Sequence, residues 1–279
     1  MIKIKFPKKI SEKKIEQFFI KEGLKDLISK KKFYVDGYEV TKKDFKDKKK
    51  DKTGKFDIRL TNNPQPPELK DLYRLYQFII LNKRTTILEF GCGYSTLIIS
   101  HALKKLKNKF KRKPFTRCFH PFKLFVVDSE KKYIDIVKKR LNKFSVGQNV
   151  NYLYSKSQMV LYAGNYATEY KKIPSVNPDF IYLDGPDHLK IKGSINNFKV
   201  SSLDMMPMSC DILKIENYLT PGTIILIDGR TSNARYLKNN FKRNWREYFD
   251  SISDQTIFLL DEKPLGRFNK EQIKFYNTI

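Results

Sequence analysis

From Thr85 onward, short apolar runs alternate with segments whose apolar residues recur at helical spacing. The runs are "TTILEF", "FKLFVVD", "NVNYLY", "PDFIYLD" and "GTIILID", and helical segments such as "LIISHALKKL" and "KKYIDIVKKRL" follow them. Parallel strands need long crossover connections, which are usually helices. The alternation therefore predicts five β/α units and a mostly parallel sheet with helices on both faces.

Two further strand-like runs, "WREYFDSI" and "QTIFLLD", follow near the C-terminus. The few residues that join them leave no room for a crossover helix, so we expect them to pair antiparallel. The pattern thus predicts an α/β fold with a doubly wound, mostly parallel seven-stranded sheet that ends in an antiparallel hairpin.

The N-terminal part has a separate pattern. The segment "SEKKIEQFFIKEGLKDLISKKK" predicts a helix with Ser11 as its N-cap, and "KFYVDGYEV" predicts a short hairpin or strand. Charged residues, Gly and Pro then replace the apolar periodicity over residues 42–71. We expect residues 1–64 to form an N-terminal α/β appendage with a basic linker, and residues 65–279 to form the main domain.

Length and cysteine content favour a cytoplasmic protein. The 279 residues suit one α/β domain with an added N-terminal piece. No apolar run approaches the length that crosses a bilayer, and "MIKIKFPKKISEKK" lacks the hydrophobic segment of a secretion signal. Cys92, Cys118 and Cys210 are far apart and odd in number, so neither a disulfide framework nor a paired-cysteine metal site is expected.

The formal net charge of +26 raises the possibility of a nucleic-acid partner. Lys greatly outnumbers Arg, however, and Arg is the better bidentate reader of phosphate. A solvated lysine surface is therefore the favoured interpretation. The segment "KNKFKRKPFTRCFHPFK", residues 107–123, interleaves basic and aromatic residues as single-strand binders do, and it keeps RNA open as a partner.

Candidate chemistry begins at the turn after the first apolar run. Gly91 and Gly93 follow "ILEF", and a helix begins near Ser95. Glycines there allow a ligand to approach the backbone closely, and the helix N-terminus offers free N–H groups. Glu89 ends the first strand and Asp128 ends the second, where a carboxylate can accept hydrogen bonds from a ribose diol.

The stretches "LEFGCGYST" and "VVDSEKKY" resemble motif I and the second-strand acid of class I S-adenosylmethionine-dependent methyltransferases. The resemblance extends from about Pro67 to Leu260. It implies a Rossmann-like methyltransferase fold that binds S-adenosylmethionine through Glu89, Gly91, Gly93, Ser95 and Asp128. A nicotinamide-binding domain would share the acid, but its third glycine is replaced by Thr96.

Later stretches are similar to small-molecule O-methyltransferases of the catechol type. "NVNYLYSKSQM" matches their third-strand segment, which implies that Ser157 and Gln158 contact the adenine ring. Those enzymes hold a divalent metal with acids after strands four and five and an adjacent asparagine. Asp184 and Asp228 match the acids, but Gly229 replaces the asparagine, so we expect chemistry without a metal, or with a weakly bound ion.

The stretch "PDFIYLDGPDHLK" delivers Asp184, Asp187 and His188 to the carboxyl edge of the sheet, which adjoins the central crevice. His188 is the preferred general base because its ordinary pKa lies near neutral pH, and Asp187 is the alternative. Asp228 and Arg230 are expected to bind the acceptor.

The absence of two sequence motifs narrows the range of methyl acceptors. No "NPPY" or "DPPY" follows the fourth strand, and no Pro-Cys dipeptide occurs, which argues against amino-methylation of bases and against cytosine C5 chemistry. We therefore expect methylation of a small-molecule or sugar-like acceptor, at oxygen. An RNA methyltransferase and a binding module without turnover remain as alternatives, because fold alone does not decide function.

Overall fold

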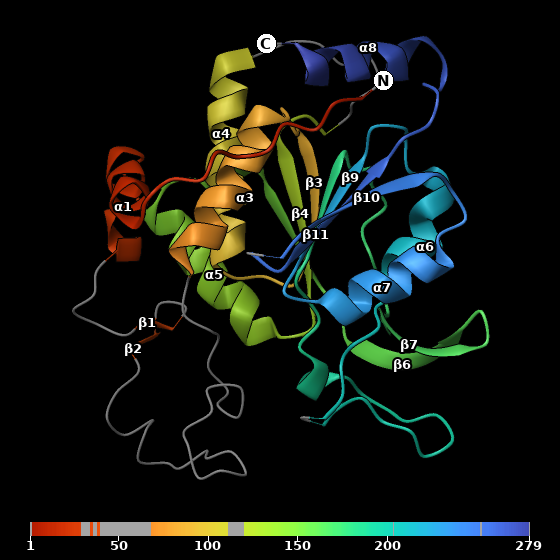
Figure 1. The fold of residues 1–279 in the computed structure, drawn as a ribbon. Helices are drawn as coiled ribbons and strands as arrows, with labels where there is room; N and C mark the ends of the chain where they lie inside the picture. Colours follow the sequence, from red (N-terminus) through yellow and green to blue (C-terminus); the bar gives the residue numbers. More distant parts are fainter. Residues whose placement is uncertain are drawn as a thin grey trace.

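A computed structural model describes residues 2–28, 34–35, 38–39, 68–110, 120–202, 204–251 and 253–278 (Figure 1). The expected basic linker lies almost entirely outside these residues, as do Cys118 and the middle of the basic segment at 107–123.

Seven strands form the central sheet, in the order β10-β11-β9-β8-β3-β4-β5. Strands β3, β4, β5, β8 and β9 pair parallel, whereas β11 pairs antiparallel with both β9 and β10. This confirms the predicted doubly wound sheet and its C-terminal hairpin. The strands are β3 (Thr86–Phe90), β4 (Lys123–Asp128), β5 (Val150–Tyr154), β8 (Phe180–Leu183), β9 (Ile224–Asp228), β10 (Trp245–Asp250) and β11 (Gln255–Leu260).

Helices cover both faces of the sheet because successive side chains of each strand point to opposite sides. In β3, Ile87 packs into the core beneath α3, α4 and α5, whereas Leu88 packs into the core beneath α6 and α7 (Figure 1). The helices are α3 (Leu69–Leu81), α4 (Tyr94–Phe110), α5 (Lys131–Lys143), α6 (Asp211–Ile215), α7 (Thr231–Asn240) and α8 (Gly266–Asn277). The connections between helices and strands contain the short 3₁₀ turns η3 (Gly147–Asn149), η4 (His188–Lys190) and η5 (Glu216–Tyr218). Among the described residues, none of the helices is long and apolar enough to cross a membrane.

One of the five expected β/α units is wrong. After β5 the chain forms an antiparallel hairpin, β6 (Ser157–Tyr162) and β7 (Asn165–Tyr170), where the repeat predicted a helix. The turn between the strands uses Ala163 and Gly164, both with positive φ. Two positive φ angles suit the tight turns that join antiparallel strands, which explains why this segment folds back on itself.

The N-terminal appendage consists of α1 (Glu12–Lys21), η1 (Lys25–Ile28) and a two-stranded pairing of β1 (Tyr34–Val35) with β2 (Tyr38–Glu39). Helix α1 begins directly after Ser11, at the expected position, although the Ser11 side chain makes no capping bond. The Phe18 ring lies 5.0 Å from the rings of Tyr73 and Tyr76 on α3. Buried Phe19 shares the hydrophobic core with the sheet, so α1 packs directly on the main domain.

The amino edge of the sheet contains a buried ionic cluster. The Asp179 carboxylate accepts bonds from the Thr85 backbone N–H and hydroxyl and from the Tyr276 hydroxyl of α8. Arg84 is fully buried, stacks 4.0 Å above the Tyr276 ring and donates to the Gly222 carbonyl oxygen at 2.7 Å. The cluster thereby ties the C-terminal helix to the start of β3.

We predict that Asp179→Ala lowers the free energy of unfolding by about 3–5 kcal/mol, because it leaves the Arg84 charge buried without its counter-charge. Urea unfolding followed by circular dichroism measures the change. Exposed Asp135 on α5 is the control position, and Asp135→Ala should unfold like the wild type. Equal stability of the two variants would contradict the proposed role of the cluster.

Candidate functional site

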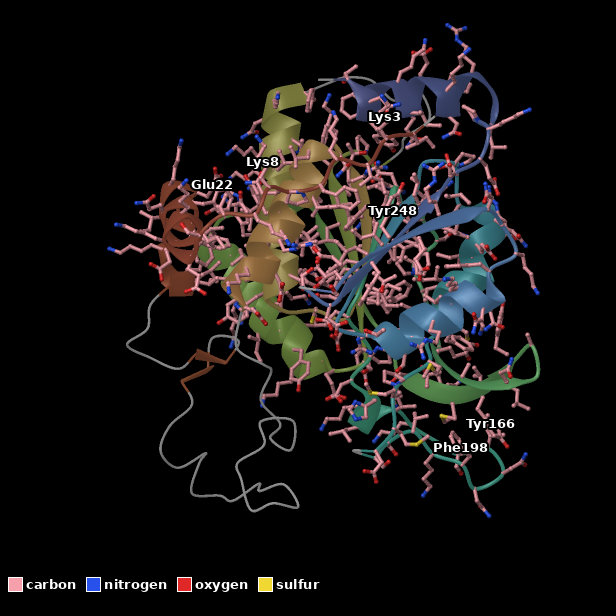
Figure 2. All side chains as sticks on the ribbon, viewed as in Figure 1. Lys3, Lys8, Glu22, Tyr166, Phe198 and Tyr248 are labelled. Atoms are coloured by element: carbon pink, nitrogen blue, oxygen red, sulfur yellow. The ribbon has the colours of Figure 1, made fainter. Side chains whose placement is uncertain are left out.

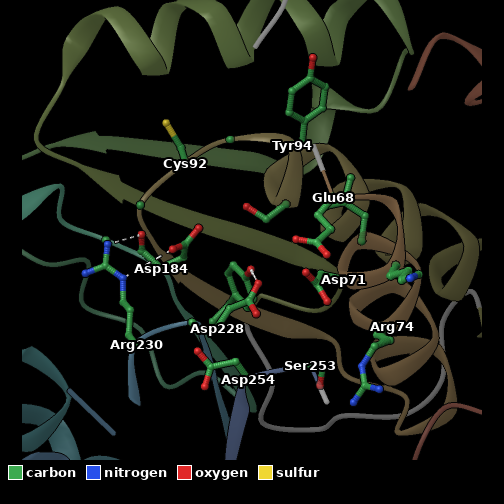
Figure 3. Close-up of a pocket in the computed structure, with 18 of the residues that line it drawn as sticks. Glu68, Asp71, Arg74, Cys92, Tyr94, Asp184, Asp228, Arg230, Ser253 and Asp254 are labelled. Carbon is green, nitrogen blue, oxygen red and sulfur yellow. Dashed lines mark hydrogen bonds and ion pairs between the residues drawn. The ribbon is translucent and has the colours of Figure 1, made fainter. Parts of the chain in front are cut away.

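A cavity of about 970 Å³ lies beyond the carboxyl ends of β3, β4, β8 and β9 (Figure 3). Residues 91–95 line it after β3, Asp128 after β4, Asp184 to Leu189 after β8, and Asp228 to Arg230 after β9. In the strand order, β4 lies on one side of β3 and β8 on the other, so the direction of winding reverses at β3. Ligands of open α/β sheets bind at this reversal.

The turns after β3 and β8 touch through their backbones. Gly91 has a φ of +87°, and a Cβ added to it would lie 2.9 Å from the Asp184 carbonyl oxygen. A Cβ on Gly185 would lie 2.5 Å from the Gly91 nitrogen. Gly93 differs, because the nearest atom to a Cβ there is the Ser95 hydroxyl oxygen at 4.0 Å. The first two glycines are needed for packing, whereas Gly93 leaves open space beside the cavity.

Asp128 holds the glycine turn in place. Its carboxylate accepts from the Cys92 backbone N–H at 2.8 Å and from the Glu130 backbone N–H at 2.7 Å. Burial raises the pKa of Asp128 to about 6, although the two backbone bonds act in the opposite direction. The carboxylate stands at the cavity wall, and each oxygen of a carboxylate can accept more than one hydrogen bond.

Glu89 lies behind the same turn and does not line the cavity. Its carboxyl group is fully buried and accepts from the Ser95 hydroxyl at 2.5 Å. Burial raises the pKa of Glu89 to about 8, so the group is largely protonated at neutral pH. Ser95 itself lines the cavity, and the Gly93 N–H donates to the Thr96 hydroxyl oxygen at 3.0 Å. These bonds shape the first turn of α4 next to the open space.

Arg230 joins the loops after β8 and β9. Its Nη2 donates to the carbonyl oxygens of Asp184 at 2.8 Å and Pro186 at 3.1 Å, and its Nε lies 3.5 Å from the Asp184 carboxylate. Burial raises the pKa of Asp184 to about 6, although the positive charge of Arg230 acts in the opposite direction. Arg230 directly precedes α7, and the hydroxyl of Thr231, the first residue of that helix, donates to Asp254 at 2.7 Å.

His188 and Asp187 reach the cavity on the short turn η4. The Asp187 carboxylate accepts from the Leu189 N–H at 3.0 Å and so caps that turn. Asp228 accepts from the Tyr182 hydroxyl at 2.7 Å and from the Gln255 side chain at 3.1 Å. Burial raises the pKa of Asp228 despite these two donors.

Two carboxylates that the sequence analysis did not anticipate line the opposite wall. Glu68 and Asp71 come from the start of α3, and their carboxylates point into the cavity (Figure 3). Burial raises the pKa of Asp71 to about 7, and the charges of Asp228 and Glu68 raise it further. Acidic residues are common in the first turn of helices, so in the sequence these two residues indicate only the start of a helix.

Ser157 and Gln158 are not among the residues that line the cavity. Both lie at the start of β6, where the Gln158 amide donates to Glu169 of β7 at 2.9 Å. Among the described residues, no group of three or more His, Cys, Asp or Glu side chains is arranged to hold a metal ion.

Neither a model of a known protein family nor a curated protein sequence matches the chain. Among solved structures it is similar to a methyltransferase of Podospora anserina with bound S-adenosylhomocysteine, at 14% identity and a TM-score of 0.43, over 70% of this chain and 80% of that one. It is also similar to an O-methyltransferase of tomaymycin synthesis from Streptomyces achromogenes, at 13% identity and a TM-score of 0.38, over 70% and 82%. Values this low carry no information about activity or substrate.

The raised pKa of Asp71 predicts a pH-dependent stability. In the folded protein Asp71 keeps its proton up to about pH 7, whereas an aspartate in the unfolded chain has a pKa of about 3.9. The folded protein thus binds more protons in this range, and the contribution of Asp71 to stability falls as the pH rises. Asp71→Asn should become more stable relative to the wild type between about pH 4 and 7. Urea unfolding at several pH values checks this, with Asp135→Asn as the control; a pH-independent difference would contradict it.

Proposed function

We propose that this protein is an S-adenosylmethionine-dependent methyltransferase that methylates a hydroxyl oxygen of a small-molecule or sugar-like acceptor. The observation that carries the proposal is the cavity at the carboxyl ends of β3, β4, β8 and β9, with open space at Gly93 and the Asp128 carboxylate in its wall. Such a place suits a nucleoside-containing ligand because glycine lets it approach the backbone and an acid binds the ribose diol.

The residues around the turn fit the cofactor. Helix α4 begins at Tyr94, beside the open space, and the N-terminus of a helix suits the carboxylate of the methionine part. Asp128 retains acceptor capacity for the ribose hydroxyls. Glu89 and Ser95 would act through the shape of this turn, since Glu89 lies behind it.

The chain's own residues would then position the acceptor. When bound, S-adenosylmethionine supplies an already activated methyl group, so the protein mainly has to align the nucleophile. His188 is placed to accept the hydroxyl proton, and Asp184, whose pKa is about 6, is a second acceptor in the same wall. Arg230 holds the loops after β8 and β9 together, and with Asp228 it forms the wall against which the acceptor would lie.

A small acceptor is favoured over RNA by the charge of the cavity. Carboxyl side chains, among them Glu68, Asp71, Asp184 and Asp228, outnumber the Lys and Arg side chains in its lining, so the phosphates of a nucleic acid would be disfavoured there. Metal-independent chemistry is favoured because Gly229 offers no side-chain ligand next to Asp228.

Cofactor binding tests the proposal directly. Wild-type protein should bind S-adenosylhomocysteine in isothermal titration calorimetry. Gly93→Ala should keep the melting temperature, because nothing crowds its Cβ, yet bind roughly 10-fold more weakly, a loss of about 1.4 kcal/mol. Asp128→Ala should lose about 1–3 kcal/mol of binding free energy.

The control for this experiment is Asp135→Ala on the exposed face of α5, which should bind as the wild type does. No binding by the wild type, or wild-type affinity in both Gly93→Ala and Asp128→Ala, would refute the assignment of the cofactor site.

The role of His188 requires an acceptor, which screening of hydroxylated metabolites and glycans with S-adenosylmethionine would supply. His188→Ala should then lower turnover by about 10²-fold while cofactor affinity is retained. His120 is the matched control, because it precedes β4 at the opposite edge of the sheet. Full activity of His188→Ala across neutral pH would exclude His188 as the base.

A further inference from the structure

Tyr170, the last residue of β7, has a buried hydroxyl group without a hydrogen-bond partner. The side chain is 4% exposed, and its ring stacks on Phe90 of β3 with 5.8 Å between centroids. Within the described part of the chain, no donor or acceptor lies within bonding distance of the hydroxyl oxygen. Phenylalanine would fill the same space without an unpaired polar group, so the hydroxyl calls for an explanation beyond packing.

Among the described residues, the other three tyrosines that are buried as deeply as Tyr170 are paired, whereas the hydroxyls of half-buried Tyr152 and Tyr236 also have no hydrogen-bond partner. Tyr76, Tyr182 and Tyr276 are each at most 3% exposed, and their hydroxyls donate to Glu22, Asp228 and Asp179, respectively. The unpaired hydroxyl of Tyr170 therefore departs from the pattern of these three, and its location becomes informative.

The hydroxyl lies where the two glycine turns meet. A Cβ on Gly185 would be 2.7 Å from the Tyr170 oxygen and 2.5 Å from the Gly91 nitrogen. Gly91 and Gly185 line the cavity, and Tyr170 lies directly behind them, outside the lining. A ligand that shifts either turn would bring the hydroxyl within reach. This is the point at which the winding of the sheet reverses.

The base of the β6–β7 hairpin also adjoins Asp128. The Ser155 N–H, two residues before β6, donates to the Asp128 carbonyl oxygen at 2.9 Å. Ser157 pairs directly with Tyr170 across the hairpin, is 1% exposed, and likewise has an unpaired hydroxyl. Burial and then the Asp128 charge raise the pKa of Tyr170 well above its usual value, so its hydroxyl keeps its proton and can donate.

We propose that the Tyr170 hydroxyl binds the adenosyl group of the cofactor, an inference that rests on the proposed function. Asp128 is the expected ribose ligand, and the Tyr170 hydroxyl lies behind the glycine turn that Asp128 holds. A phenol both donates and accepts, so a ribose hydroxyl or a purine nitrogen satisfies it. Tyr170 is thus a cofactor-binding residue that no sequence motif identifies.

The test is Tyr170→Phe, which removes one oxygen and keeps the ring. Calorimetry with S-adenosylhomocysteine and, separately, with adenosine should show affinities about 5- to 10-fold weaker than those of the wild type for both ligands. Tyr166→Phe is the matched control, because Tyr166 lies on the same face of β7 but its exposed hydroxyl accepts from Asn196 (Figure 2). That variant should bind both ligands as the wild type does.

The outcomes separate the alternatives. Wild-type affinity in Tyr170→Phe would overturn the proposal and leave a buried water as the partner of the hydroxyl. A loss for S-adenosylhomocysteine but not for adenosine would overturn the assignment to the adenosyl group. A melting temperature of ligand-free Tyr170→Phe far below that of the wild type would show that the hydroxyl already has a partner. Absence of binding by the wild type would refute the proposed function itself, and the inference with it.

Discussion

The backbone contact between Gly91 and Gly185 is the constraint on which the candidate site depends. The carboxyl ends of β3 and β8 approach so closely that a Cβ on either glycine would overlap backbone atoms of the other turn. Beyond this contact the chain diverges, since α4 packs over one face of the sheet and α6 over the other. The cavity opens where the segments that follow β3 and β8 move apart. Asp128 fixes one turn through the Cys92 N–H, and Arg230 fixes the other through carbonyl oxygens.

Electrostatics distinguish the cavity from the rest of the molecule. The chain has a formal net charge of +26, yet carboxylates such as Asp71, Asp184 and Asp228 gather in the cavity wall. Burial raises the pKa of each of these three groups, because removal from water disfavours the charged form. Partial protonation therefore relieves the repulsion that three neighbouring charges would otherwise impose. The arrangement leaves Asp71 and Asp184, with pKa values of about 7 and about 6, as proton-accepting groups in the cavity wall.

The strand-forming periodicity of the sequence predicted most of the fold, and it failed at one segment. The sequence predicted five β/α units, and the third of them has no helix after its strand. The chain forms the β6–β7 hairpin there, with positive φ at Ala163 and Gly164. A parallel β-bridge joins Thr168 of this hairpin to Ser209, and periodicity along the chain does not predict such a contact between distant segments.

Sequence by itself determined the mostly parallel sheet with its C-terminal hairpin and the residues of the turn after β3, because these depend on local periodicity and on glycine conformations. It led to Gly91, Gly93, Asp128, Asp184 and His188, which the fold gathers around one cavity. Only the tertiary structure brought Asp71 to Asp228, and it placed Ser157 and Gln158 away from the cavity lining. Such contacts join residues far apart in the chain, and their geometry follows from how helices and hairpins pack on the sheet.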